Sequence, residues 1–282
     1  MTDIAVIGSG PSGLSAAVTA AVRNKSVTVL GEDISKNPLY KAEKVNNYLG
    51  LPGITGKELL EAFHGHAESA GVGIGEGKVT QIMPMGEHFL VNCNNMFIEA
   101  KTVIIATGIP SSKAIKGESE FLGKGVSYCA TCDGMLYRGK SVIVVGETPE
   151  AENEAVFLSE ICAKVRYMPL YSGAVKEFDG VIAMDGEKPV EIRGGRFVTS
   201  LLTENGETEC DGVFLIKKTL PVSSLLYGLE TENGAIKTNR NSETNVGGVF
   251  ACGDCTGKPY QIGKAAGEGT TAALQACKYL GG

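Results

Sequence analysis

A glycine-rich loop near the start of the chain constrains the fold more than any other feature. It follows the apolar, β-branched run of residues 3–8, precedes the small apolar residues 14–22, and matches the pattern G-x-G-x-x-G. In this context the glycines permit a tight strand-to-helix turn and let the backbone approach a pyrophosphate at the helix N-terminus. Residues 27–30 read as the next strand, so the chain opens with a βαβ unit. The loop consists of Gly8, Ser9, Gly10, Pro11, Ser12 and Gly13.

Glu32 supports a nucleotide ligand for this loop. It stands at the end of the second expected strand, about 20 residues after the loop, where a carboxylate accepts hydrogen bonds from ribose hydroxyls. We therefore predict that the loop binds an adenine dinucleotide. The alternative, a glycine turn without a ligand, needs no carboxylate at that strand end.

The same strand–helix–strand order returns in the middle of the chain. Residues 141–146 read as a strand, residues 150–162 as a helix and residues 164–168 as another strand. A strand at 249–254 and an Ala-rich helix at 264–280 close the chain. Two βαβ units predict two α/β domains.

We expect two Rossmann-like, doubly wound, three-layer domains, one interrupting the other. Residues 1–112 and 243–282 are expected to form a discontinuous outer domain around the glycine loop. Residues 113–242 are expected to form the smaller central domain. Within the outer domain, residues 89–98 look like a hairpin and residues 102–106 like a separate buried strand.

Composition excludes several function classes. The chain has 26 Lys and Arg against 32 Asp and Glu, a net charge of −6, whereas nucleic-acid-binding proteins concentrate positive charge on one face. The N-terminus lacks the basic leader and apolar core of a signal peptide, and no apolar stretch approaches the roughly 20 residues of a membrane span. We expect a cytoplasmic protein with neither nucleic acid nor membrane as a partner.

Cys129 and Cys132 form a Cys-x-x-Cys pair. Because cytosolic chains keep structural thiols reduced, this spacing predicts a redox-active pair. The alternative is half of a zinc site that Cys252 and Cys255 complete, although zinc ligands usually lie closer together in sequence. Asp133, next to the second thiol, could transfer a proton during thiol–disulfide exchange or could simply be a turn residue.

Along its whole length the sequence resembles the low-molecular-weight thioredoxin reductases. The resemblance rests on the glycine loop, on Gly125-Val126-Ser127-Tyr128 leading into the Cys-Ala-Thr-Cys-Asp motif of residues 129–133, and on three further stretches in family order. These are Asn47-Tyr48-Leu49-Gly50, Ala106-Thr107-Gly108 and Gly248-Val249-Phe250-Ala251-Cys252-Gly253-Asp254. The resemblance implies a homodimeric flavoprotein that holds FAD in the outer domain and reduces the disulfide of thioredoxin.

The resemblance also implies roles for individual residues. Cys132 is expected against the flavin, Cys129 is expected to exchange with thioredoxin, and Asp133 is expected to act as the acid. No metal ion is implied. The expected FAD contacts are the residues of the glycine loop together with Glu32, Asn47, Val79, Thr107, Gly108, Gly253, Asp254, Gln261 and Ile262.

The sequence departs from this family in the second βαβ unit. Typical members have a G-x-G-x-x-A loop for NADPH, but residues 146–151 read Gly-Glu-Thr-Pro-Glu-Ala. Where the family has His-Arg-Arg for the 2′-phosphate, residues 169–171 read Pro-Leu-Tyr. Carboxylates also gather at the start of the following helix, where the dipole favours an anion. The absence of two glycines and of the arginines argues against NADPH binding.

We therefore predict a thioredoxin reductase that takes its electrons from reduced ferredoxin, similar to the ferredoxin-dependent flavin thioredoxin reductases. Three alternatives stay open. The chain could use NADPH at a degenerate site, it could be a flavin dithiol oxidase that passes electrons to oxygen, or it could be a non-catalytic scaffold. The intact motif from Cys129 to Asp133 argues against the last.

Overall fold

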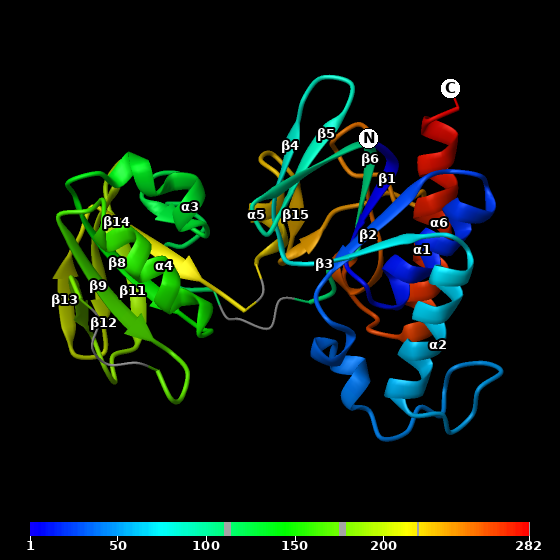
Figure 1. Ribbon diagram of the computed structural model, residues 1–282, viewed down its shortest axis with the longest axis horizontal. Coiled ribbons are helices and arrows are strands. Elements are labelled where there is room, and N and C mark those ends of the chain that lie inside the picture. Colours follow the sequence, from blue (N-terminus) through cyan, green and yellow to red (C-terminus); the bar gives the residue numbers. More distant parts are fainter. Residues whose placement is uncertain (110–113, 175–178, 219, 282) are drawn as a thin grey trace. The chain divides into compact units, whose positions relative to one another are not determined.

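The computed structural model of the chain describes residues 1–109, 114–174, 179–218 and 220–281. It divides into an outer unit, Met1–Pro110 with Pro221–Gly282, and a central unit, Ser111–Leu220 (Figure 1). Each unit has a hydrophobic core of its own. Two α/β units, one inserted in the other, confirm the predicted fold class.

The outer unit is built on a seven-stranded sheet. Five strands run parallel in the order β3-β2-β1-β6-β17, and the hairpin β4–β5 extends the sheet along β6. The glycine loop therefore follows the middle strand of the parallel part. The strands are β1 (Thr2–Ile7), β2 (Val27–Gly31), β3 (Gly73–Glu76), β4 (Val79–Pro84), β5 (Phe89–Cys93), β6 (Met96–Ile105) and β17 (Val249–Ala251).

Strand β6 pairs with both the antiparallel and the parallel part of this sheet. Its first half pairs antiparallel with β5, and its second half pairs in parallel with β1 and β17. The sequence suggested that residues 96–98 and 102–106 are separate strands, but the pairing continues across the charged residues between them. Glu99 and Lys101 remain exposed, and Lys101 Nζ lies 2.8 Å from Asp3 Oδ1 on β1. A charged stretch can continue a strand when its side chains alternate toward solvent.

Three helices pack together on one face of the outer sheet (Figure 1): α1 (Pro11–Val22), α2 (Gly56–Ser69) and α6 (Ile262–Tyr279). Helices α1 and α6 lie so close that a Cβ on Gly269 would be 2.1 Å from the backbone oxygen of Ser12. The sequence analysis missed α2, although Thr55 and Glu58 form a capping box at its start. Of the helices described, none is long and apolar enough to cross a lipid bilayer.

The chain returns to the outer unit at Pro221, so the boundary expected at 242/243 lies too late. The reason is packing: α5 lies against β4, and β16 lies against η4. The boundary expected at 112/113 falls outside the described residues. The short elements of the outer unit are η1 (Ile34–Lys36), η2 (Pro38–Lys41), α5 (Val222–Leu225), β15 (Thr231–Glu232), β16 (Ala235–Ile236) and η4 (Gly253–Thr256).

The central unit contains a parallel sheet in the order β10-β9-β8-β14-β7 and an antiparallel sheet, β11-β12-β13. The parallel strands are β7 (Val126–Ser127), β8 (Ser141–Gly146), β9 (Lys164–Pro169), β10 (Val181–Ala183) and β14 (Gly212–Ile216). The antiparallel strands are β11 (Pro189–Gly194), β12 (Val198–Thr203) and β13 (Gly206–Glu209). The helical elements are α3 (Ala130–Asp133), η3 (Gly134–Tyr137) and α4 (Glu150–Ser159).

These elements form three layers around two cores. On one face of the parallel sheet, Ile143 and Val213 pack with Ile192 and Leu201 of the antiparallel sheet. On the other face, Val144 and its neighbours pack against α4 and the turn that includes α3. One outer layer of the central unit is thus a sheet rather than helices, and the turn with the cysteine pair belongs to the helical layer.

Candidate active site

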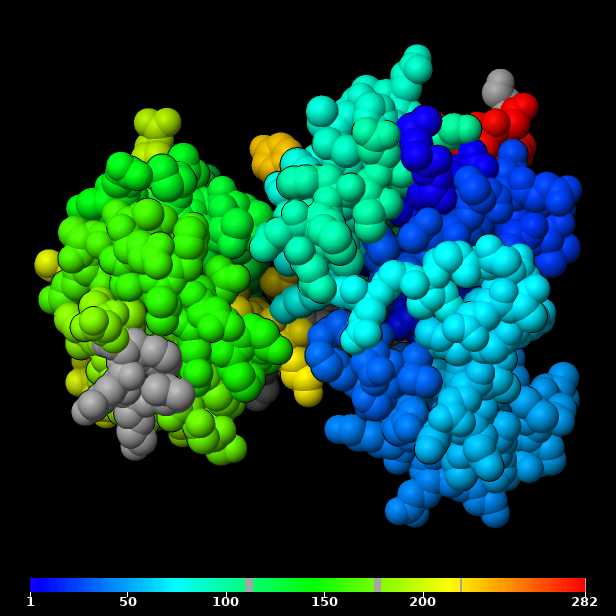
Figure 2. Space-filling model, viewed as in Figure 1, coloured from blue at the N-terminus to red at the C-terminus, as the bar shows by residue number. Residues whose placement is uncertain are grey.

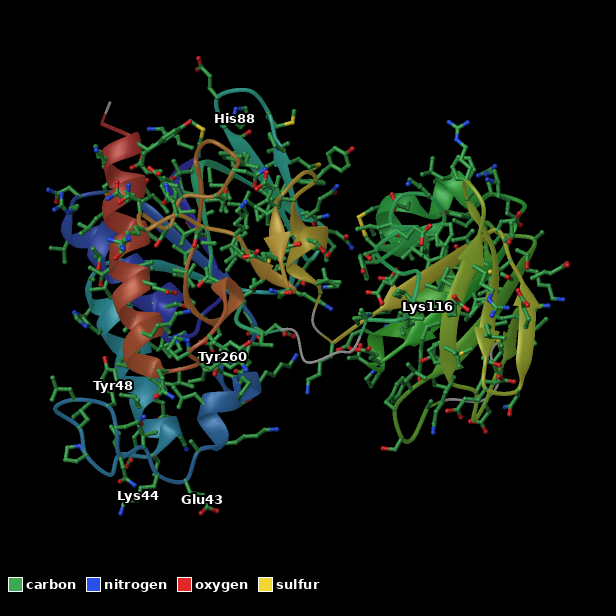
Figure 3. All side chains as sticks on the ribbon, turned by 180° about the vertical axis from the view of Figure 1, so that it is seen from behind. Glu43, Lys44, Tyr48, His88, Lys116 and Tyr260 are labelled. Atoms are coloured by element: carbon green, nitrogen blue, oxygen red, sulfur yellow. A yellow bond between two sulfur atoms is a disulfide. The ribbon has the colours of Figure 1, made fainter. Side chains whose placement is uncertain are left out.

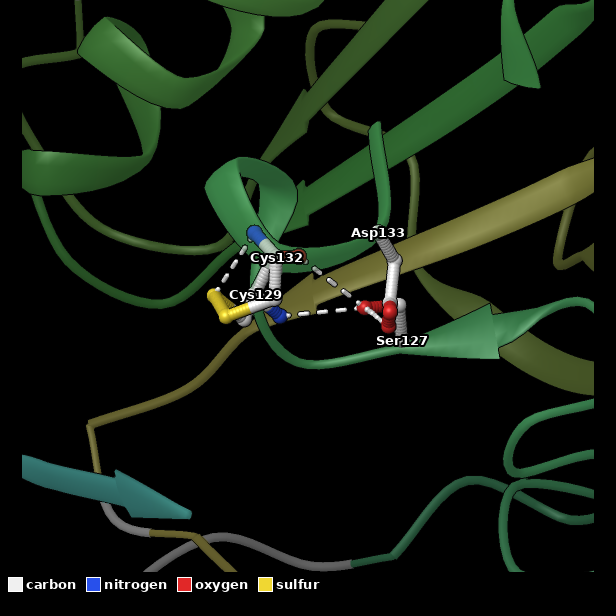
Figure 4. Close-up of a disulfide and its surroundings, with 4 residues drawn as sticks. All are labelled: Ser127, Cys129, Cys132 and Asp133. Atoms are coloured by element: carbon white, nitrogen blue, oxygen red, sulfur yellow. Dashed lines mark hydrogen bonds between the residues drawn. A yellow bond between two sulfur atoms is a disulfide. The ribbon is translucent and has the colours of Figure 1, made fainter. Parts of the chain in front are cut away.

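Cys129 and Cys132 are joined by a disulfide at the start of the short helix α3, directly after β7 (Figure 4). Cys129 is the N-cap residue, and its Sγ accepts a hydrogen bond of 3.1 Å from the backbone N–H of Cys132. Cys132 is exposed, and Cys129 is half-buried. The disulfide therefore lies at the surface in a tight helical turn, where one sulfur can be attacked by an external thiolate.

Ser127 connects Asp133 to this turn (Figure 4). Its hydroxyl lies 2.6 Å from Asp133 Oδ2, to which it donates, and it accepts a hydrogen bond of 3.1 Å from the backbone N–H of Cys129. The carboxylate is half-buried and is held beside the disulfide, where it can exchange a proton with a thiol. The sequence analysis gave Ser127 no role. The available signals were its position two residues before the first cysteine and its place in the stretch of residues 125–128 that resembles the family.

A buried ion pair is connected to the cysteine turn through Tyr128. Lys217 Nζ is 2.8 Å from Glu118 Oε2, and their side chains are only 3% and 2% exposed. Glu118 also accepts hydrogen bonds from the Tyr128 hydroxyl (2.6 Å) and from the backbone N–H of Ile115 (2.7 Å). Burial, and then the charge of Glu118, raise the pKa of Tyr128 far above its ordinary value. Because Tyr128 precedes Cys129, this network fixes one end of the redox turn.

Glu154 of α4 is a second carboxylate near the turn that the sequence analysis missed. Burial raises its pKa, and the backbone N–H of Thr131, between the two cysteines, partly opposes that rise. Its Oε2 atom is buried without a hydrogen-bond partner in the described part of the chain. Burial therefore keeps this carboxyl in its neutral form to a higher pH than an exposed glutamate.

The two cysteine pairs of the alternative zinc site differ in oxidation state and belong to different units. Cys129 and Cys132 are disulfide-bonded in the central unit, whereas Cys252 and Cys255 are buried free thiols of the outer unit. No group of three or more His, Cys, Asp or Glu residues suited to a metal ion occurs within the described ranges.

The glycine loop has the geometry that a dinucleotide requires. Gly8 has φ +116°, and a Cβ there would lie 2.3 Å from the backbone oxygen of Ala106. A Cβ on Gly13 would lie 1.9 Å from the oxygen of Gly8. Gly10 is the N-cap of α1 and offers no side-chain cap, so N–H groups of the first turn remain available to an anion. Only glycine fits the two crowded positions.

Four further predicted contacts follow the two strands that come after β1 in the parallel order, β6 and β17. Thr107 and Gly108 come after β6, and Gly253 and Asp254 come after β17. Three neighbouring parallel strands therefore bring these residues and the glycine loop to one carboxyl edge of the sheet, where ligands of such sheets bind. Thr107 Oγ1 and Asp254 Oδ1 are buried without hydrogen-bond partners among the described residues. Buried atoms of this kind usually have a partner, and a bound ligand would supply one.

The remaining predicted contacts lie around this edge. Glu32 follows β2 and pairs with Lys36 at 3.1 Å, and Val79 is buried at the start of β4. Asn47 Nδ2 donates a 2.8 Å hydrogen bond to Gln261 Oε1. Ile262 then opens α6. Tyr48, which follows Asn47, and Tyr260, which precedes Gln261, are labelled in Figure 3.

The second βαβ unit has the expected topology, but its own side chains occupy the carboxyl edge. A Cβ on Gly146 would lie 2.4 Å from Ala151 Cβ. Glu147 Oε2 accepts a 3.0 Å hydrogen bond from the backbone N–H of Lys218, after β14. The Tyr171 hydroxyl, after β9, donates to Glu152 at the start of α4. The carboxylates at this edge are thus bound within the unit.

Comparison with known proteins identifies the family. A family model described as pyridine nucleotide-disulphide oxidoreductase matches residues 2–269. A thioredoxin reductase from Bacillus subtilis is 33% identical over 99% of this chain and 94% of that protein. The crystal structure of a ferredoxin-flavin thioredoxin reductase from Clostridium acetobutylicum is 47% identical, with a TM-score of 0.87 over 99% of this chain and 98% of that one.

An atypical thioredoxin reductase from Desulfovibrio vulgaris Hildenborough is 30% identical, with a TM-score of 0.77 over 100% of this chain and 98% of that one. These similarities extend over both units and agree with the glycine loop and the disulfide. The chain therefore belongs to the pyridine nucleotide-disulphide oxidoreductases and, within them, to the low-molecular-weight thioredoxin reductase family.

Proposed function

We propose that the protein reduces the disulfide of thioredoxin through Cys129 and Cys132, using FAD in the outer unit and electrons from reduced ferredoxin. One observation supports this donor above all: the redox turn is intact, while side chains of the central unit fill the edge where a nicotinamide cofactor would bind. A solved structure that is 47% identical to the chain is of a ferredoxin-flavin thioredoxin reductase.

FAD fits the outer unit. Members of the thioredoxin reductase family are FAD-binding flavoproteins, and a pyrophosphate can approach the glycine loop at the start of α1. Glu32 directly follows β2, and we assign its carboxylate to the ribose hydroxyls. The orphaned buried oxygens of Thr107 and Asp254 offer hydrogen-bonding atoms to the ligand. When bound, FAD can accept electrons singly from an iron–sulfur protein and deliver a pair to a disulfide.

The cysteine pair passes this electron pair to thioredoxin. In the reduced enzyme the Cys129 thiolate attacks the thioredoxin disulfide, forms a mixed disulfide and releases one thioredoxin thiolate. Cys132 then attacks Cys129, which reforms the enzyme disulfide and releases the second thiolate. Asp133 is positioned by Ser127 to supply a proton to a departing thiolate. Two electrons and two protons move from the enzyme dithiol to thioredoxin.

The carboxyl edge of the central unit argues against NADPH as the donor. Glu147 and Glu152 place carboxylates there that hydrogen bonds retain. Lys217, directly after β14, is committed to Glu118 inside the unit. A pyrophosphate would have to displace or repel these carboxylates at a helix N-terminus that otherwise attracts anions.

We also infer a homodimer. Apolar side chains on the segment between β2 and α2 face solvent, with Leu49 99% and Leu51 41% exposed. This segment lies on the surface of the outer unit (blue in Figure 2). Exposed apolar residues grouped on one loop favour contact with another protein surface. Light scattering of the purified protein at several concentrations should give twice the chain mass.

The donor is tested by anaerobic mixing. Reduced ferredoxin should bleach the flavin absorbance at about 450 nm, where oxidised flavins absorb, and NADPH should not. Rapid bleaching by NADPH would refute the proposed donor and favour an ordinary reductase. Peroxide formation from a small dithiol and oxygen, without turnover of thioredoxin, would favour a dithiol oxidase.

The thiol chemistry is tested with Cys132→Ser. This variant should still be bleached by ferredoxin, because its outer unit is unchanged, but it should no longer release reduced thioredoxin. Thr131→Ser is the matched control, because it changes an exposed residue of the same turn and leaves both sulfurs. Unchanged thioredoxin reduction by Cys132→Ser would exclude every mechanism that uses this pair.

A further inference from the structure

The turn that carries Asp254 is sharply bent at both ends. Gly253 at its start has φ +83°, and Gly257 directly after it has φ +105°. A Cβ on Gly253 would lie 2.4 Å from the hydroxyl oxygen of Ser12 on α1. The turn therefore depends on glycine at its ends.

An ion pair on α6 contacts this turn. Lys264 Nζ and Glu268 Oε2 are 3.0 Å apart, and their side chains are 17% and 33% exposed. Lys264 donates to the backbone oxygens of Gly253 at 3.0 Å and Gly257 at 2.8 Å. Glu268 accepts a 2.9 Å hydrogen bond from the backbone N–H of Gly253 and lies 3.0 Å from the Thr256 hydroxyl. The pair thus binds the backbone on both sides of Asp254.

The same two charges act on the Asp254 carboxylate. Burial is the largest influence and raises the pKa of Asp254, Lys264 lowers it, and Glu268 raises it. Lys264 and Glu268, both from α6, are the charged groups of the described structure that act on Asp254. Among the described residues, the Oδ1 atom of Asp254 is buried without a hydrogen-bond partner, as expected of an atom that binds a ligand hydroxyl.

We propose that Lys264 and Glu268 are positioning residues of the FAD site, which hold the Asp254 turn in place and act on its carboxylate with opposite charges. This inference rests on the proposed binding of FAD in the outer unit but not on the identity of the electron donor. An ionised carboxylate is the stronger acceptor for a ligand hydroxyl, so FAD affinity should fall as acid protonates Asp254.

Removing one charge or the other should shift the pH at which Asp254 takes up its proton in opposite directions. Without the ammonium of Lys264, Asp254 should take up its proton at higher pH. Without the carboxylate of Glu268, it should do so at lower pH. The two midpoints should therefore move apart, one above and one below that of the wild-type protein. A pair that served only as a structural brace would shift both variants in the same direction or in neither.

The experiment uses apoprotein of Lys264→Gln and Glu268→Gln, titrated with FAD at a series of pH values by flavin fluorescence. The pH midpoint of FAD affinity should rise in Lys264→Gln and fall in Glu268→Gln. At neutral pH each variant should bind FAD about tenfold more weakly, because hydrogen bonds to the turn are lost. Lys278→Gln, at an exposed position of the same helix, is the charge-matched control and should change neither quantity.

Circular dichroism at each pH checks that the variants are folded. If either single variant does not fold, the double variant Lys264→Gln/Glu268→Gln decides: it should keep the wild-type midpoint, because the opposite effects cancel, and should bind FAD more weakly. Midpoints that shift in the same direction, or a double variant with wild-type affinity, overturn the inference. Failure of the wild-type chain to bind FAD would refute the proposed cofactor site itself.

Discussion

Replacing Lys217 with Met should destabilise the central unit strongly. The substitution removes the ammonium group from a pair in which both side chains are almost fully buried. Glu118 keeps its hydrogen bonds from Tyr128 and Ile115 but becomes a buried carboxylate without its cation. Removing one partner of a buried ion pair typically costs about 3–5 kcal/mol.

That cost is large for a protein of this size. Domains are usually stable by only about 5–15 kcal/mol, so Lys217→Met should remove about a fifth or more of the free energy of unfolding. The effect should also reach the redox turn, because Glu118 holds the Tyr128 hydroxyl 2.6 Å away and Tyr128 adjoins Cys129. We therefore expect reduced thioredoxin turnover at temperatures where the outer unit still retains FAD.

Urea unfolding followed by circular dichroism measures this loss, while flavin fluorescence follows the outer unit separately. Lys218→Met is the matched control, since Lys218 is the exposed neighbour and should change stability by less than about 0.5 kcal/mol.

A second variant tests the cause. Lys217→Met/Glu118→Gln removes both charges and keeps an oxygen that can accept from Tyr128, so it should recover part of the lost stability. A loss below about 1 kcal/mol for Lys217→Met would refute the reasoning. So would a double variant that is no more stable than the single one.

Three further outcomes are expected. Ser127→Ala should slow thioredoxin reduction about tenfold, less than the roughly 10²–10⁴-fold that loss of a general acid costs, because Asp133 itself remains. FAD content should not change, and an unchanged rate would show that Asp133 does not need its hydrogen bond from Ser127. Gly13→Ala should lose FAD in a gel-filtration assay, because its Cβ would meet the Gly8 oxygen at 1.9 Å; full retention would contradict the close packing. The hydrogen bond from Lys101 is the first cause that lowers the pKa of Asp3 to about 2. The ionised Asp3 carboxylate therefore adds to the free energy of unfolding above about pH 4, and this contribution is lost as the pH falls toward 2. The Asp3→Asn variant should lack this part of the wild-type pH dependence when it is unfolded by acid.

Local motifs made much of the fold predictable. The glycine loop lies between a strand and a helix in the structure, as the sequence predicted. The second βαβ unit also forms where the sequence predicted it. Both depend on contacts between residues close in sequence, so turn chemistry and hydrophobic periodicity are enough to identify them. Helix α2 was missed even though its capping box was present in the sequence at Thr55 and Glu58.

The errors concern packing between distant segments. Whether residues 221–242 belong to the outer or the central unit depends on contacts of α5 with β4 and of β16 with η4, and no local pattern encodes such contacts. Strand β6 is likewise continuous because β5 pairs with its first half, and β1 and β17 pair with its second half. Tertiary context overrides local strand preference in such cases.

The sequence by itself determined the chemistry: a dinucleotide loop at residues 8–13, a thiol pair at Cys129 and Cys132, and the loss of a second phosphate-binding loop. These features need only the right residue types at short spacings. The tertiary structure alone decided which charges support that chemistry. Lys217 meets Glu118 across 99 positions of sequence, and Lys264 and Glu268 reach back to the turn after β17. A charged side chain has no fixed partner until the backbone has folded, because its interaction energy depends on distance and burial rather than on sequence order.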